Sequence, residues 1–243
     1  MRAQYRLHCI ATTPVKPEAN DLRNLPAYSI AEASRYLRLP SATLRSWFVG
    51  RSYPTAKQRR DFAPLIDPSN TKPLQLSFWN MIEAHVLRAL RVDHSVSIRS
   101  LREAIQFAEQ KLEIEHLLLS RELRTSAGQV FLDKYGQLIN LSASGQIAMR
   151  RLLEEHLNRV EWDQWQFPVR LYPFGSSGVS TNDRHIAIDP TIAFGRPVIL
   201  SKGISTRAIT DRLDAGETVD AVAADYDLTP AEIEEAILYE RAA

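Results

Sequence analysis

Two small hydroxyl side chains, Ser41 and Thr43, precede an arginine, Arg45, in a stretch with helical spacing. Leu44 and Phe48, in the same stretch, are four residues apart, which is the spacing of an inward-facing helical stripe. Small polar residues at a helix start can approach base pairs, and an arginine one turn further on can donate to them. The pattern predicts the second helix of a helix-turn-helix, with Ser41, Thr43 and Arg45 on DNA.

Basic residues surround this stretch on both sides. Cations at such positions bind the phosphate backbone and set the register without reading bases. The predicted phosphate contacts are Arg35 and Arg38 in the first helix and turn, and Arg51, Lys57, Arg59 and Arg60 in the following segment. The alternative is a structural helical hairpin with solvated arginines, because helix-turn-helix patterns also occur in protein-binding modules.

Two short helices and a wing must position these side chains. Ser29 can cap a first helix with apolar residues at helical spacing. Pro40 disfavours helical geometry at the residue before it, and Ser41 can cap a second helix that runs to Gly50. Residues 51–73 are rich in Arg, Lys, Pro and Ser without a helical period, so we expect a hairpin or wing there.

The chain contains residue types that enzymes use, but their spacing does not indicate a shared catalytic or metal site. The lone cysteine, Cys9, allows neither an internal disulfide nor a cysteine-based zinc cage. The histidines lack metal-ligand spacing: His8, His85, His94, His116, His156 and His185. One acidic cluster suggests a divalent metal and leaves a metal-dependent nuclease as an alternative: Asp211, Asp214, Glu217 and Asp220. We expect that the protein is not an enzyme and that it has no catalytic residues, no metal and no cofactor.

Charge is divided unevenly along the 243 residues, although the whole chain carries only +1. Residues 1–72 carry net +7, residues 73–203 net +1 and residues 204–243 net −7. A basic head suits a phosphate backbone, whereas an acidic tail suits a protein with a basic face. The sequence has neither a run of about eighteen apolar residues nor a signal-peptide pattern, so we expect a cytoplasmic protein without membrane contact.

The periodicity of the remaining chain predicts a mainly α fold with small β elements, of the α+β class. Helices are expected over residues 77–90 and 97–112, a β-hairpin over 129–141 about a glycine-bearing turn at Gly136, a helix over 145–159 and a strand over 167–174. Two short strands at 185–190 and 197–200 should precede three helices over 205–215, 218–225 and 229–241.

Composition divides the chain into five segments, with the clearest boundary at a Gly/Ser-rich stretch. The segments are a flexible arm at 1–27, a winged helix-turn-helix with a helical extension at 28–112, a central hairpin and helix region at 113–174, a linker at 175–184 and a C-terminal domain at 185–243. Apolar residues of the central region, including Trp162, Trp165 and Phe167, suit either a dimer contact or core packing. A two-fold operator requires a dimeric reader, so we expect a homodimer.

Residues 28–50 resemble the opening of the MerR-type winged helix-turn-helix family. The matching residues are Tyr28, Ile30, Ala31, Glu32, Ala33, Thr43, Leu44, Arg45 and Trp47, and Leu76-Ser77-Phe78 resembles the restart after the wing. The resemblance implies DNA contact by Thr43 and Arg45. Ala42 and Ser46 depart from the family's pattern, and its long coiled coil and cysteine effector site are missing, so no sensor role is implied.

Residues 185–239 resemble a small domain, formerly of unknown function, whose members act as antitoxins beside PIN-like ribonuclease toxins. The matching residues are Ile188-Asp189-Pro190, Gly195-Arg196-Pro197-Val198-Ile199, Gly203-Ile204, Thr206-Arg207, Gly216-Glu217 and the final helix pair. With both ends considered, the chain resembles the long antitoxins of the VapB class. The resemblance implies two partners, which are operator DNA and a PIN-like ribonuclease toxin.

The candidate toxin-binding residues are Arg196, Arg207 and Tyr239. An arginine could meet the clustered carboxylates of a PIN-type active site, but each arginine could instead pair with a neighbouring acid, Asp189 or Asp211. We expect an antitoxin that neutralises such a toxin and autoregulates its operon. The alternative is a stand-alone winged helix-turn-helix transcription regulator whose C-terminal domain binds another protein.

Overall fold

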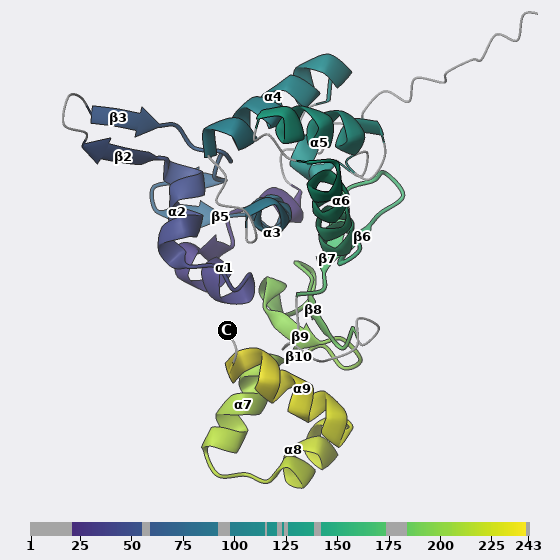
Figure 1. Ribbon diagram of the computed structural model, residues 1–243. Coiled ribbons are helices and arrows are strands. Elements are labelled where there is room, and N and C mark those ends of the chain that lie inside the picture. Colours follow the sequence, from purple (N-terminus) through teal and green to yellow (C-terminus); the bar gives the residue numbers. More distant parts are fainter. Residues whose placement is uncertain are drawn as a thin grey trace, which may run out of the picture.

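Helices dominate the structure, and small antiparallel sheets lie among them (Figure 1). It is a computed structural model that describes residues 21–54, 59–91, 98–114, 116–120, 123, 126–138, 142–173 and 184–241. This architecture confirms the predicted fold class, mainly α with small β elements. In these residues, no helix has both the length and the apolar character to cross a bilayer.

The first helix begins where the sequence predicts. α1 spans Ile30–Tyr36, and Ser29 caps it. The Glu32 backbone N–H donates to the Ser29 hydroxyl (3.2 Å), while the Ser29 N–H donates to the Glu32 carboxylate (2.9 Å). This reciprocal capping box satisfies two of the backbone donors that a helix start leaves free.

The second helix, α2, spans Ser41–Val49 and completes the predicted helix-turn-helix. Gly50 ends it with φ 78, in the left-handed region that glycine adopts easily. The prediction that Ser41 caps this helix is wrong by one position, because Pro40 is the cap residue. Ser41 is the first helical residue, and its hydroxyl lies 2.7 Å from that of Ser34 in α1.

A β-hairpin follows α2 at the predicted wing. β2 spans Arg51–Pro54 and β3 spans Arg59–Phe62, with Arg51 opposite Phe62. In Figure 1 this hairpin extends outward from the end of α2. A second sheet has the order β1-β5-β4, with bounds Tyr28–Ser29, Leu74–Leu76 and Asn70–Thr71.

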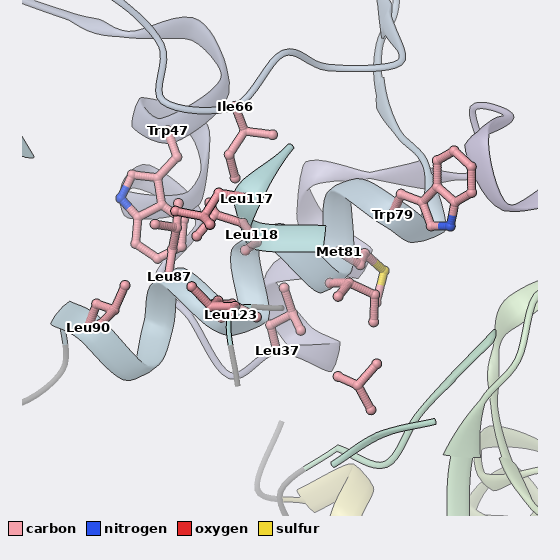
Figure 2. Packing of buried hydrophobic residues seen from close by; sticks show 14 of the residues in the cluster. Leu37, Trp47, Ile66, Trp79, Met81, Leu87, Leu90, Leu117, Leu118 and Leu123 are labelled. Carbon is pink, nitrogen blue, oxygen red and sulfur yellow. The ribbon is translucent and has the colours of Figure 1, made fainter. Parts of the chain in front are cut away.

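Two longer helices carry the main core, as the apolar spacing predicts. α3 spans Phe78–Arg91 and α4 spans Ile98–Leu112. Their inward residues, with the short turn η2 over Leu117–Leu119, pack against α1 and α2 in one cluster. Figure 2 shows part of it, with Trp47 of α2 beside Leu87 of α3. Burial of this apolar surface holds α2 in place.

The predicted β-hairpin over residues 129–141 is wrong. α5, a helix over Ser126–Leu138, occupies most of that range, and residues 139–141 lie outside the described residues. Phe131 and Tyr135, one helical turn apart, are both fully buried, and their ring centroids lie 5.7 Å apart. The apolar residues therefore follow a helical period and not the alternation of a strand.

A close helix contact explains the glycine that suggested a turn. Gly136 lies inside α5, where a Cβ would come within 2.9 Å of the Gln146 side chain. Gln146 belongs to α6, which spans Ala143–Leu157 near the predicted helix. The absence of a side chain at Gly136 thus allows α5 and α6 to approach each other.

After α6 the chain enters an antiparallel sheet of order β10-β9-β8-β7-β6. The bounds are Val160–Trp162 for β6, Pro168–Leu171 for β7, Ile186–Ile188 for β8, Pro197–Ile199 for β9 and Ile204–Ser205 for β10. Leu171 in β7 lies opposite Ile188 in β8. One sheet therefore joins residues on both sides of the segment 174–183, which lies outside the described residues.

Three helices follow the sheet, as predicted, and form a group of their own in Figure 1. The bounds are Thr206–Asp214 for α7, Val219–Tyr226 for α8 and Pro230–Arg241 for α9. Thr229 and Glu232 form the predicted capping box, with the Thr229 N–H donating to the Glu232 carboxylate at 2.8 Å. The helices pack around a second apolar cluster that includes Ile209 and Val222.

The predicted flexible arm at 1–27 does not hold for its last residues. Residues 1–20 lie outside the described residues, but a short 3-10 turn, η1, spans Leu22–Asn24. Arg23 forms ion pairs of 2.6 Å with Asp21 and Asp163, and its guanidinium lies 5.5 Å from the Trp79 ring centroid. These contacts attach residues 21–24 to α3 and to the β6–β7 turn.

A buried histidine pair joins α3 to α6. The Nε2 atom of His85 lies 3.0 Å from the carbonyl oxygen of His156, and the two ring centroids are 5.0 Å apart. Burial, reinforced by the neighbouring His156, lowers the pKa of His85 well below its usual range. The folded chain therefore keeps His85 neutral at pH values where the unfolded chain binds a proton there.

We expect the contribution of His85 to make the fold less stable as the pH falls below about 6.5, the usual pKa of histidine. Because the folded-state pKa is depressed, this contribution is complete above that pH and is lost below it, by up to about 1.4 kcal/mol per pH unit. The variant His85→Gln should flatten the dependence. Urea unfolding of both proteins, at one pH above and one pH below that pKa, measures how the unfolding free energy changes with pH. An equal change in the parent chain and in the variant would contradict the prediction.

Candidate DNA and partner interfaces

The exposed face of α2 carries one arginine between two small apolar side chains. Ala42, Arg45 and Val49 all face solvent, and their spacing of three and four residues places them on one side of the helix. On the opposite side Leu44 and Phe48 are buried, as predicted. An arginine can donate two hydrogen bonds to a guanine, and small apolar groups can contact the thymine methyl. This face has the chemistry to read bases in a major groove.

The two hydroxyl side chains predicted to touch DNA are differently placed. Ser41 is exposed but its hydroxyl is hydrogen bonded to Ser34, whereas Thr43 is half-buried. The Ser46 hydroxyl donates to the Thr43 carbonyl at 2.7 Å. Sequence reasoning missed Val49, although its position four residues after the arginine would have placed it on the same face.

The wing brings cations next to α2. Arg51 is exposed at the start of β2, and Arg59 and Arg60 occupy the facing strand β3. Lys57 lies outside the described residues. Because the hairpin follows α2 directly, its first strand begins next to the end of that helix (Figure 1).

The two arginines predicted to bind phosphate from the first helix and turn lie against aromatic rings. Arg35 is half-buried, with its guanidinium 5.2 Å from the Tyr36 ring centroid. Arg38 has a left-handed backbone, φ 51, and its guanidinium lies 5.5 Å from the Tyr239 ring centroid in α9. Burial lowers the pKa of Arg38. Arg38 therefore forms part of a contact between the helix-turn-helix and the C-terminal helices.

Tyr239, a candidate toxin-binding residue, belongs to the same contact. Its side chain is 2% exposed, and its hydroxyl lies 3.5 Å from the Tyr36 carbonyl oxygen. Residues far apart in the sequence thus hold α9 against α1. In this arrangement Tyr239 offers almost no surface to another protein.

A fixed loop connects β8 to β9. The Asp189 carboxylate is buried and accepts hydrogen bonds from the Thr191 backbone N–H (2.9 Å) and hydroxyl (2.6 Å). The Arg170 guanidinium donates two more, at 2.9 and 3.1 Å. The loop ends at Gly195, where a Cβ would lie 2.0 Å from the Tyr28 hydroxyl. The loop is therefore tied to the sheet at one end and packed against β1 at the other.

The two candidate toxin-binding arginines differ in their ion pairs. Arg207 pairs with Asp211 at 2.7 Å, as the structural alternative proposes. Asp189 pairs with Arg170 and not with Arg196. Arg196 is exposed, and the described residues supply no carboxylate within ion-pair distance of it. Of the two, Arg196 is the cation available to a partner.

The acidic cluster that suggested a metal site is partly used in ion pairs. Arg212 of α7 pairs with Glu217 and, at 2.7 Å, with Asp225. Across the ranges that the structure describes, three or more His, Cys, Asp or Glu side chains are nowhere grouped to hold a metal ion.

Comparison with known proteins matches both ends of the chain. Residues 26–105, from before α1 into α4, match a family described as "Putative DNA-binding HTH domain". Residues 186–239, from β8 to α9, match one described as "Protein of unknown function (DUF433)". The chain is also 28% identical over 234 residues to "Putative antitoxin VapB45" of Mycobacterium tuberculosis, covering 88% of this chain and 93% of that relative. The chain is VapB-like.

The VapB-like chain also shares its fold with a solved protein. The X-ray crystal structure of Rv2018 from Mycobacterium tuberculosis matches with a TM-score of 0.65 and 24% identity, covering 88% of this chain and 98% of that chain. These findings confirm the resemblance to the VapB class and the helix-turn-helix that the sequence predicts.

Proposed function

We propose that this VapB-like chain is a non-catalytic antitoxin that binds operator DNA through α2 and the β2–β3 wing. The exposed face of α2 is the observation that carries the DNA half, because Arg45 stands between two small apolar side chains beside a basic hairpin. This combination suits major-groove recognition, because a bidentate donor can read guanine and small apolar groups can contact the thymine methyl. A homodimer would present two such faces to a two-fold operator in the cytoplasm.

The second half of the proposal is that the chain neutralises a PIN-like ribonuclease toxin through its C-terminal part. The similarity to a relative named as an antitoxin supports it. So does the charge division, since residues 204–243 carry net −7 and suit a toxin that is basic enough to hold RNA. Arg196 and Arg207 are the candidate arginines for the toxin's carboxylates, and of the two only Arg207 has an ion pair among the described residues.

Co-expression with the product of the adjacent gene tests the toxin half. We expect a stable complex whose magnesium-dependent RNA cleavage is silent and returns when the chain is removed. Without a complex, but with salt-sensitive binding to its own upstream DNA, the chain would be a stand-alone transcription regulator. Nuclease activity of the isolated chain that a chelator abolishes would instead support a metal-dependent nuclease.

The variant Arg45→Ala should weaken binding to the upstream DNA by roughly 10- to 100-fold, because a bidentate arginine–guanine contact contributes about 1–3 kcal/mol. Arg241→Ala is a matched control, since Arg241 is also exposed but lies at the end of α9. Fluorescence anisotropy with a labelled duplex at fixed salt measures both. Equal affinities of the two variants would show that α2 does not read the DNA.

A further inference from the structure

The β8–β9 loop contains three consecutive residues with left-handed backbones. Their φ angles are 47° for Ala193, 57° for Phe194 and 73° for Gly195. Glycine adopts this region freely, but alanine and phenylalanine do not, because the Cβ comes too close to the following carbonyl oxygen. Strain of this kind persists only where surrounding contacts fix the backbone, and it concentrates at functional sites.

The contacts that fix this backbone surround the turn on both sides. The Ile192 N–H donates to the Asp189 carbonyl (3.0 Å), and the Gly195 N–H donates to the Ile192 carbonyl (2.9 Å). Asp189 is itself held by Arg170 from the neighbouring strand. At the other end, Gly195 has no room for a Cβ beside the Tyr28 hydroxyl. The turn is therefore held rigidly in its strained form.

This rigid turn exposes an aromatic ring. Phe194 is 89% exposed, more than any other large hydrophobic side chain in the described ranges. The ring contributes almost nothing to the core, and a glycine or asparagine would suit the left-handed backbone better. The fold thus accepts both backbone strain and a solvated ring at one position. A rigid exposed aromatic is the typical anchor of a protein interface.

We infer that Phe194 is the anchor by which this chain binds its toxin, with Arg196 as the charged contact beside it; this inference rests on the function proposed above. The partner surface must then offer an apolar pocket next to a carboxylate. Arg196 is exposed two residues after Phe194 and has no ion pair among the described residues. A second copy is a poorer occupant, because a two-fold contact through this loop would bring one Arg196 against the other.

The variants Phe194→Gly and Phe194→Asn test the inference with two measurements that move in opposite directions. Both remove the ring and suit the left-handed backbone, so the free chain should unfold at a temperature higher by roughly 2–4 °C. Its affinity for the co-expressed toxin should fall by about 30-fold or more, the size expected for a hot-spot residue. A residue needed only for folding would not raise stability while lowering affinity.

Trp165→Ala is the matched control. Trp165 is also aromatic and 59% exposed, but it lies on the β6–β7 turn of the same sheet. Its replacement should change toxin affinity by no more than about twofold, and both Phe194 variants should bind the upstream DNA like the parent chain. Isothermal titration calorimetry on the full chain and the purified toxin measures the affinities.

The outcomes separate this inference from the proposed function. If the parent chain forms no toxin complex, the antitoxin function fails and the anchor role fails with it. If the parent complex forms but Phe194→Gly binds equally well, the function stands and only the anchor is wrong. If Phe194→Gly instead converts a dimer to a monomer in light scattering while toxin affinity is kept, a second copy occupies the loop and the inference is overturned.

Discussion

The variant Gly195→Ala should lower the midpoint of thermal unfolding by roughly 6–12 °C, the shift expected for a loss of about 3 kcal/mol in a chain of this size. Two costs add at this position. The φ of +73° disfavours any L side chain by about 1–2 kcal/mol. The new methyl group would also lie 2.0 Å from the Tyr28 hydroxyl and 2.9 Å from its ring, and overpacking of this kind costs about 1–3 kcal/mol.

Gly216→Ala separates the two costs. Gly216 also has a positive φ, +96°, but a Cβ there would meet nothing within 4 Å. It should therefore lose only the backbone contribution, about 1–2 kcal/mol. Adding Tyr28→Phe to Gly195→Ala should restore part of the stability, because it removes the nearest clashing atom. Equal losses for Gly195→Ala and Gly216→Ala in differential scanning calorimetry would disprove the close packing of the loop on β1.

The variant Asp189→Ala should destabilise the fold by about 3 kcal/mol, since it removes a buried carboxylate that accepts four hydrogen bonds and leaves the Arg170 guanidinium with Glu161 as its remaining ion-pair partner. The same change removes both hydrogen bonds to Thr191, so the turn that presents Phe194 loses its support. We therefore expect weaker toxin binding together with the loss of stability. Chemical denaturation and calorimetry on the same preparation measure the two effects.

Asp211→Ala is the control for Asp189→Ala. Asp211 pairs with Arg207 at 2.7 Å, a distance similar to that of the buried pair, but both side chains are more than half exposed. Exposed pairs are screened by water and salt, so its loss should change the unfolding free energy by about 0.5 kcal/mol or less. If the two variants lost similar amounts of unfolding free energy, the burial of Asp189 would not be the reason that its ion pair stabilises the fold.

The helix-turn-helix could be predicted from sequence because local residues set its boundaries. Ser29 and Glu32 form their capping box within one turn of chain, and Gly50 ends α2 through its own φ angle. The exposed and buried faces of α2 follow from the same helical period. Most of the candidate DNA face, including Arg45, was therefore predictable without knowledge of the rest of the chain.

The central helix was missed because glycine has different roles in different surroundings. Gly136 suggests a turn when only its neighbours are considered. In the structure it lies against Gln146, and that contact depends on how α5 and α6 pack. The helical spacing of Phe131 and Tyr135 is the stronger signal, because both rings pack on the buried side of α5.

Contacts between distant segments were beyond any local pattern. Tyr36 and Tyr239 are 203 residues apart, yet the backbone of one meets the hydroxyl of the other. The same contact buries Tyr239, a candidate partner residue, and places Arg38 over its ring. Exposure of a candidate residue depends on such contacts, which explains why Phe194 was overlooked in the sequence and is prominent in the structure.

The pairing of β7 with β8 has a consequence for proteolysis. Because Leu171 and Ile188 lie opposite each other in one sheet, cleavage of the backbone between Pro173 and Arg184 would not by itself separate the two pieces. The cut chain should elute from gel filtration as one particle and dissociate only in denaturant. Release of either piece alone would expose an unpaired strand edge, which is a template for aggregation. Degradation that begins at this segment therefore has to unfold the sheet before either half can be removed.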